Sequence, residues 1–245
     1  MVYERYSNFV ASICDSDLLG FKSNPDYTYM LEHVMRDYGE DYLKCILAST
    51  NIKIQDIQEF CKLNDSVGDP NKEKYDGLDI PVSPTSLRYI LHADLILTHM
   101  KEVCDVNADV IELGGGYGGL CLAMHHFAPK HAVCIKSYTI CDLPSIIRLQ
   151  KNFLKRVSPS LTVEFIDACG HGSEIAETNL FLISNYCFSE ISEENRNLYQ
   201  KILFPKVRHG FMAWNHIPVY DFGFHARTCP EIPIFENTLN KLVYF

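Results

Sequence analysis

The chain has 245 residues, a formal net charge of −9 at pH 7, 47% hydrophobic residues and an isoelectric point near 5.5. This length and hydrophobic content are enough for the core of one decorated domain, or of a domain with a small cap. The acidic balance and the lack of a long run of Lys and Arg disfavour nucleic acid and anionic membranes as partners, because both are bound through clustered cations.

The cysteines and the chain start indicate a cellular compartment. Ten cysteines are scattered along the chain without a C-x-x-C pair, so no zinc site or other metal site is expected. Several lie inside apolar runs, where free Cys behaves as a small hydrophobe, and this fits a reducing setting. The first ten residues lack the layout of a signal peptide, and no apolar stretch reaches transmembrane length. We expect a cytoplasmic protein without a membrane span.

The first part of the chain is predicted to be mostly helical. Apolar residues recur at helical spacing over residues 26–38 and 40–48, and another helix is expected over residues 54–63. Residues 64–81 follow as a turn-rich segment with repeated Gly and Pro. We therefore expect residues 1–82 to form an N-terminal helical cap that shapes the substrate pocket.

A long helix is expected to open the main domain, residues 83–245. Ser83-Pro84-Thr85 is typical of a helix start, since Ser caps free N–H groups and Pro fits the first turn. Helical spacing then continues to about residue 103.

From residue 109 onward, strand-like and helix-like segments alternate. The expected strands are residues 110–113, 138–141, 161–166, 180–184 and 211–214, with 233–236 and 242–245 as a closing antiparallel pair. The expected helices are residues 118–127, 144–157 and 193–207. This alternation predicts an α/β, Rossmann-like fold with a mostly parallel seven-stranded sheet and helices on both faces. Ligands of such sheets bind beyond the carboxyl ends of the strands.

The most informative segment runs from Val110 to Leu120 and reads VIELGGGYGGL. It predicts a strand, a glycine turn and the start of a helix. Glycines leave room for a ligand and accept positive φ, and the helix N-terminus adds free N–H groups and positive potential. We therefore expect a nucleoside cofactor at this turn, contacted by Gly114, Gly116 and Tyr117.

Two patterns fit this turn. Gly114, Gly116 and Gly119 match the dinucleotide fingerprint G-x-G-x-x-G. With Glu112 in front, the segment also matches E-x-G-x-G-x-G, the first motif of class I S-adenosylmethionine (SAM) methyltransferases. The carboxylate of Glu112 favours SAM, which has an ammonium group to neutralise and no pyrophosphate. More than 100 residues precede the turn, whereas a dehydrogenase usually opens with it. NAD(P) and a turn without a ligand remain as alternatives.

Polar residues end the other expected strands. Asp142, before Leu143, is placed to accept hydrogen bonds from both ribose hydroxyls, and it also fits a helix N-cap. Asp167, with the small Ala168 beside it, is placed for an adenine amino group, although a solvated loop Asp would look the same. These residues and Glu112 extend the predicted cofactor site.

The segment that follows the fourth strand has its own pattern. Asn185-Tyr186-Cys187-Phe188 faintly echoes the Asn-Pro-Pro-Tyr motif of amino-group methyltransferases but lacks both prolines. We expect Asn185 at the cofactor and Tyr186 at the substrate, with core packing as the alternative for Tyr186. Trp214 is the only tryptophan; it either stacks on a sugar face or fills the core, and the core is slightly favoured.

Four segments together resemble one family. They are SPTSLRY from Ser83, ELGGGYGGL from Glu112, YTICDLP from Tyr138 and ISNYCFSE from Ile183. The chain resembles the sugar O-methyltransferases, class I SAM enzymes associated with the sugars of glycans and glycosylated metabolites. The similarity covers about residues 64–215. It implies the class I methyltransferase fold, SAM as cofactor, S-adenosylhomocysteine as product and a sugar or glycan as acceptor.

The resemblance also implies that the Ser83–Tyr89 segment approaches the cofactor. Arg88 then pairs with the SAM carboxylate, with Thr85 nearby, because a guanidinium binds a carboxylate through two parallel hydrogen bonds. The alternative is an Arg on the solvated face of the helix.

Methyl transfer requires alignment of acceptor oxygen, methyl and sulfur, and a base for the acceptor hydroxyl. The base candidates are Glu190, His216 and His171, each of which also fits a structural role in a loop or helix cap. We therefore expect a SAM-dependent sugar O-methyltransferase. The alternatives are methylation of a non-sugar metabolite at a hydroxyl, carboxylate, phosphate-linked group or amine, a non-catalytic cofactor-binding module, and an NAD-dependent oxidoreductase. Homo-oligomerisation and fusion to glycan-building domains stay open.

Overall fold

The computed structural model describes residues 2–13, 17–104, 107–234 and 239–245. Within these ranges, no helix has the length and apolar composition needed to cross a membrane. The same residues contain no group of three His, Cys, Asp or Glu side chains arranged to hold a metal ion.

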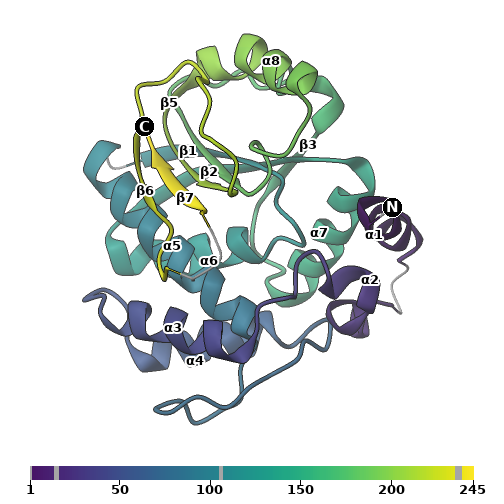
Figure 1. Cartoon of the computed structure of the whole chain (residues 1–245), viewed down its shortest axis with the longest axis vertical. Helices are drawn as coiled ribbons and strands as arrows, with labels where there is room; N and C mark the ends of the chain where they lie inside the picture. The colour runs from purple at the N-terminus through teal and green to yellow at the C-terminus, as the bar shows by residue number, and fades with distance from the viewer. Residues whose placement is uncertain (1, 14–16, 105–106, 235–238) are drawn as a thin grey trace.

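A seven-stranded sheet forms the centre of the molecule, in the order β3-β2-β1-β4-β5-β7-β6 (Figure 1). Its strands are β1 (Asn107–Leu113), β2 (Cys134–Asp142), β3 (Glu164–Asp167), β4 (Leu180–Asn185), β5 (Val207–Trp214), β6 (Arg227–Pro230) and β7 (Lys241–Tyr244). β1 to β5 are parallel, whereas β7 runs antiparallel to both β5 and β6. The dinucleotide-binding fold has the order 3-2-1-4-5-6. The antiparallel β7, inserted beside β5, therefore separates this sheet from that fold.

Helices cover both faces of the sheet. α5 (Pro84–Val103), α6 (Gly119–Phe127) and α7 (Pro144–Val157) cover one face, and α8 (Glu193–Ile202) covers the other (Figure 1). Because side chains alternate along a strand, Val110 of β1 enters the core beneath α5 to α7, and its neighbour Ile111 enters the core beneath α8. The mostly parallel α/β sheet is thus confirmed. Short 3₁₀ helices lie at Asp17–Leu19, Phe21–Ser23, Ala128–His131, Ala168–Gly170 and Phe204–Lys206.

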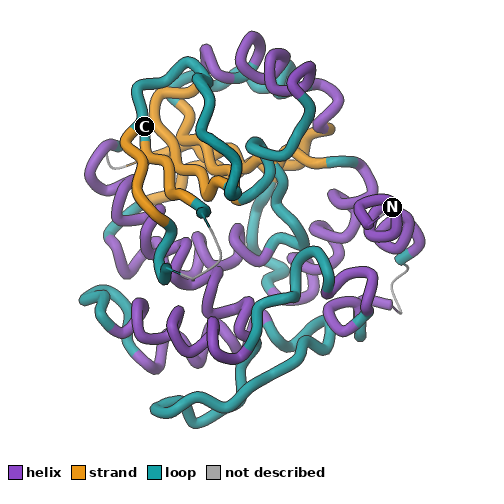
Figure 2. Tube along the Cα trace, viewed as in Figure 1, coloured by secondary structure: helices purple, strands orange, loops and turns teal. Residues whose placement is uncertain are grey.

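The N-terminal helices pack against this layer and share its core. They are α1 (Val2–Ser12), α2 (Pro25–Thr28), α3 (Arg36–Leu47) and α4 (Ile54–Asn64). α3 and α4 contact α5, and α1 contacts α7. Figure 2 shows the long loop after α4 at the lower edge of the molecule. The buried side chains of these helices belong to the same core as those of α5 to α7. The division into a cap, residues 1–82, and a cofactor-binding domain, residues 83–245, therefore remains a prediction about the roles of these two parts.

The expected helix over residues 26–38 is wrong. Helical backbone stops at Thr28, residues 29–35 form turns and extended backbone, and α3 starts at Arg36. Contacts from α5 explain this, because Arg88 donates a hydrogen bond to the carbonyl of Leu31 and Ser83 donates one to the carboxylate of Glu32. Tertiary contacts here override local helix propensity.

Two boundaries in the second half also differ. α8 ends at Ile202 and not at 207, because Pro205 follows and cannot continue the helix. β6 lies at Arg227–Pro230 rather than at 233–236, of which residues 235 and 236 lie outside the described residues. β6 is an edge strand whose side chains are mostly exposed, so it lacks the apolar alternation by which a strand is predicted.

Candidate functional site

The glycine turn lies where β1 meets α6, beside the point at which the strand order reverses between β1 and β4. Gly114, Gly116 and Gly118 have φ of +75°, +56° and +97°. A Cβ on Gly114 would lie 2.5 Å from Cβ and Sγ of Cys187, which follows β4. The turn thus requires glycine both for its left-handed backbone and for this close approach. Ligands of open α/β sheets bind at such reversal points.

Asp142 ends β2 and lies against the turn. Its carboxylate accepts hydrogen bonds from the backbone N–H of Leu143 (2.8 Å), from Nε2 of Gln150 (2.8 Å) and from the backbone N–H of Gly115. Burial raises the pKa of Asp142 to about 6, although these bonds oppose the shift. The carboxylate is therefore mostly charged at pH 7. The N-cap alternative for Asp142 is wrong, because Leu143 is the N-cap residue of α7 and no side chain caps that helix.

Gln150 is a site residue that the sequence patterns did not identify. It is fully buried on α7, and its Nε2 also donates to the carbonyl of Gly116 (3.0 Å), so one amide joins the turn to Asp142. Its Oε1 has no hydrogen-bond partner. A polar residue at an apolar position of a strongly amphipathic helix is the signal that could have identified it.

Glu112 is buried beside the glycine turn, with its Oε2 3.5 Å from the Cβ position of Gly115. Its side chain is 2% exposed, and Oε2 accepts a hydrogen bond from the hydroxyl of Tyr138 (2.8 Å). Burial, with the negative charge of Asp142 adding to it, raises the pKa of Glu112 to about 7. This carboxylate is thus engaged inside the core beneath α6 and α7.

Asp167 and Ala168 lie beside Asp142 at the end of the neighbouring strand. Asp167 pairs in register with Asp142 across β2 and β3. Its Oδ1 accepts a hydrogen bond from the backbone N–H of Cys169 (2.9 Å), so it also caps the short 3₁₀ helix that follows. The structure therefore brings both predicted acidic residues to the same edge of the sheet.

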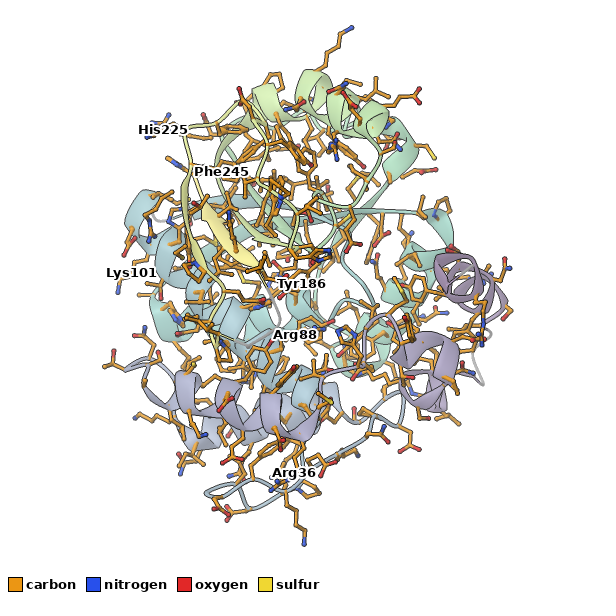
Figure 3. All side chains as sticks on the ribbon, in the orientation of Figure 1. Arg36, Arg88, Lys101, Tyr186, His225 and Phe245 are labelled. Atoms are coloured by element: carbon orange, nitrogen blue, oxygen red, sulfur yellow. The ribbon has the colours of Figure 1, made fainter. Side chains whose placement is uncertain are left out.

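Arg88 is buried on α5, not solvated. Its side chain is 8% exposed, and Nη2 donates to the carbonyl of Leu31 (3.1 Å). Figure 3 shows Arg88 beside Tyr186, and the guanidinium lies 5.9 Å from the centre of that ring. Among the described residues, no carboxylate oxygen lies within 4.0 Å of this guanidinium. Thr85, one turn earlier on α5, is buried and bonds Glu32 through its side chain.

Asn185 and Tyr186 meet a buried pair that the sequence did not reveal. Asn185 Nδ2 donates to Nδ1 of His92 (2.8 Å), and the Tyr186 hydroxyl donates to Glu231. His92 and Glu231 are 1% and 4% exposed, and His92 Nε2 lies 3.5 Å from Glu231 Oε1. His92 lies one helical turn after Arg88 on α5. This spacing is the only local feature of the sequence that could have indicated His92 as a site residue.

The electrostatics of this pair keep Glu231 charged. Burial alone would raise the pKa of Glu231, but the nearby imidazole of His92 and hydrogen bonds from Tyr186 and Asn240 outweigh it and hold the pKa below its usual value. Burial lowers the pKa of His92. His92 and Glu231 thus connect the segment after β6 to the end of β4 through Asn185 and Tyr186.

Two of the three base candidates lie together. Glu190 follows β4 and accepts a hydrogen bond from Asn215, which precedes His216 at the end of β5. His171 instead follows β3, donates from Nε2 to Asn195 (3.0 Å) and packs on Tyr199. β3 lies three strand spacings, about 14 Å, from β4. The structure therefore brings Glu190 and His216 together and places His171 at a separate strand end.

Two predicted ligand residues turn their side chains into the core. Tyr117 is fully buried, and its hydroxyl accepts a hydrogen bond from Asn64 (2.9 Å), so only its backbone belongs to the turn. Trp214 is fully buried among Phe188, Tyr220 and Phe222. Its ring leaves no face open for a sugar, which favours the core alternative.

The buried position of Trp214 predicts a simple optical result. Because it is the only tryptophan, fluorescence excited at wavelengths that tyrosine does not absorb reports on this side chain alone. We expect folded protein to resist quenching by iodide and to show no emission change when sugars are added. Denatured protein, in which the ring is exposed, is the control and should be quenched readily. Efficient quenching of the folded protein would show that the ring is open to ligands.

Comparisons with known proteins give fold likenesses only. No protein-family model matches the chain, and no curated protein matches it, so the resemblance to sugar O-methyltransferases remains a prediction. Among solved structures, the methyltransferase domain of bacterial CtHen1-CN is 13% identical with a TM-score of 0.48, covering 63% of this chain and 96% of that one. An rRNA methylase from Streptococcus thermophilus is 14% identical with a TM-score of 0.44, covering 60% and 91%. LepI in complex with SAM is 10% identical with a TM-score of 0.42, covering 60% of this chain and 45% of LepI.

Proposed function

We propose that this chain is a SAM-dependent O-methyltransferase that acts on a hydroxyl of a sugar or glycan. The observation that carries the proposal is the buried guanidinium of Arg88, which has no carboxylate partner in the described chain and lies on the helix beside the glycine turn. A buried cation is costly unless a partner is supplied. The carboxylate of the amino-acid end of SAM fits that need.

The other residues of the site are placed to bind the ribose and the adenine of the nucleoside. Asp142 holds the ribose hydroxyls, Asp167 and Ala168 lie at the adenine, and the left-handed backbone at Gly114 and Gly116 lets the ligand approach the end of β1. The antiparallel β7 argues against a dinucleotide cofactor, because the dinucleotide-binding order has no such strand.

The chain's own residues must position the acceptor and remove its proton. Bound SAM supplies a methyl group already activated on a sulfonium. Glu190 and His216, which follow β4 and β5, are the base candidates that lie near each other, since His216 acts electrostatically on Glu190. Asn185 and Tyr186 follow at the end of β4, where Asn185 is placed for the cofactor and Tyr186 for orienting the acceptor. Residues 29–35 cover the turn, because Leu31 Cδ1 lies 3.5 Å from the Cβ position of Gly116.

Product analysis tests the acceptor class. The protein is incubated with SAM carrying an isotopic label in its methyl group and with a panel of free sugars, glycosides and non-sugar metabolites. We expect label on a sugar hydroxyl, located by mass spectrometry and linkage analysis. Label found only on a carboxylate, amine or non-sugar hydroxyl would contradict the sugar assignment while leaving methyl transfer intact.

A further inference from the structure

Glu32 has an oxygen without a partner. The residue lies in the segment 29–35, which contacts α5. Its Oε2 accepts a hydrogen bond from the hydroxyl of Ser83 (3.3 Å), and the Thr85 side chain also bonds the carboxylate. Oε1 is buried and accepts no hydrogen bond. A carboxylate oxygen in this state is costly unless a donor completes it.

Glu32 and Arg88 are neighbours that do not pair with each other. Thr85, which bonds Glu32, and Arg88 are three residues apart on α5 and therefore share one face of that helix. Arg88 in turn bonds the carbonyl of Leu31, the residue before Glu32. Yet no oxygen of Glu32 lies within 4.0 Å of the guanidinium. An unpaired cation and an unpaired anion thus lie side by side.

We propose that Glu32 binds the α-ammonium of SAM, so that Arg88 and Glu32 together hold both charges of its amino-acid end. This rests on the function proposed above. Each of the two side chains lacks the partner that a zwitterion supplies, a carboxylate for one and an ammonium for the other. Leu31 places Glu32 next to the turn, since it packs against Gly116. Burial also raises the pKa of Glu32 in the free protein, and a bound ammonium would lower it again.

Apart from Arg88, the other charged side chains near Glu32 already have partners, which leaves Glu32 as the carboxylate for the ammonium. Glu112, the carboxylate expected for the ammonium, faces Tyr138 inside the core. Lys22 and Asp65 also act on Glu32 electrostatically, but Lys22 Nζ already donates to the carbonyl of Asn64 (2.6 Å) and Asp65 accepts from Ser86 (2.6 Å). Glu32 also lines a cavity of about 430 Å³, whose other walls include Glu73 and Pro84.

Calorimetric affinities of three ligands distinguish the binding of the ammonium from the binding of the carboxylate. S-adenosylhomocysteine carries both, its decarboxylated analogue keeps only the amine, and 5′-methylthioadenosine has neither. In Glu32→Gln we expect affinity for the first two to fall about tenfold or more, with methylthioadenosine unchanged, because a hydrogen bond to a charged group is lost. In Arg88→Met only S-adenosylhomocysteine should weaken. Glu73→Gln, on the wall of the same cavity, is the matched control and should bind all three normally.

Other outcomes would overturn the inference. It fails if Glu32→Gln binds S-adenosylhomocysteine as tightly as the unchanged protein. It also fails if this variant loses methylthioadenosine to the same extent, since that would indicate a structural defect. If the unchanged protein binds none of the three ligands, the proposed function fails and the role of Glu32 falls with it.

Discussion

Replacing Gly114 by alanine is expected to abolish cofactor binding and to destabilise the fold by several kcal/mol. Two effects add at this position. φ is +75°, a backbone conformation that costs an L-residue about 1–2 kcal/mol. The new Cβ would also lie 2.5 Å from Cβ and Sγ of Cys187, so the segment after β4 must move away from the turn.

Gly77 provides the matched control. Its φ is +88°, and a Cβ there would meet nothing within 4 Å. Gly77→Ala should therefore show the backbone cost alone, about 1–2 kcal/mol, and keep ligand binding. Urea unfolding gives the free energies, and a thermal-shift titration with S-adenosylhomocysteine gives binding. Equal losses of stability in the two variants would show that contact between Cys187 and the turn is unimportant.

Asp142→Asn is expected to weaken binding of the nucleoside by about 2–3 kcal/mol, roughly 30- to 150-fold, because hydrogen bonds from the ribose hydroxyls to a charged acceptor are lost. The variant should fold. The new side chain keeps one oxygen, which can accept from Gln150 Nε2 as Asp142 does, so that Gln150 also keeps its bond to Gly116. Asp109→Asn is the control, since Asp109 accepts hydrogen bonds near the opposite end of β1 and should not affect binding.

The same carboxylate predicts a pH dependence. With a pKa of about 6 in the free protein, Asp142 gains a proton as the pH falls through 6 and loses its charge. Affinity for 5′-methylthioadenosine should therefore fall as the pH is lowered from 7 to 5, whereas in Asp142→Asn it should change little. This ligand lacks the amino-acid end, so Glu32 does not contribute. An unchanged wild-type affinity at pH 5 would contradict the ribose contact.

Local patterns predicted the framework of the site. Left-handed backbone, a tight turn and a helix start all favour glycine locally, so the sequence around Gly114 was sufficient to place the turn. Asp142 was predictable because it ends a buried strand and precedes a helix-starting Pro. α7 was predicted at its observed bounds, since its apolar residues follow one face along its whole length.

Contacts between distant segments were not predictable. His92 and Glu231 lie far apart in the chain and meet only because β7 and β6 fold back beside β5. Residues 29–35 were expected in a helix, but Arg88 holds their backbone out of it. The direction of the Glu112 side chain depends on Tyr138 in the neighbouring strand. A single sequence contains no local pattern that predicts these contacts between distant segments.

Calorimetric titration of the unchanged protein with S-adenosylhomocysteine and with NADH tests the central claim, that the glycine turn at Gly114 binds the adenosyl group of SAM. We predict saturable binding of S-adenosylhomocysteine at one site per chain and no heat of binding with NADH. Binding of NADH in place of S-adenosylhomocysteine, or binding of neither, would contradict it.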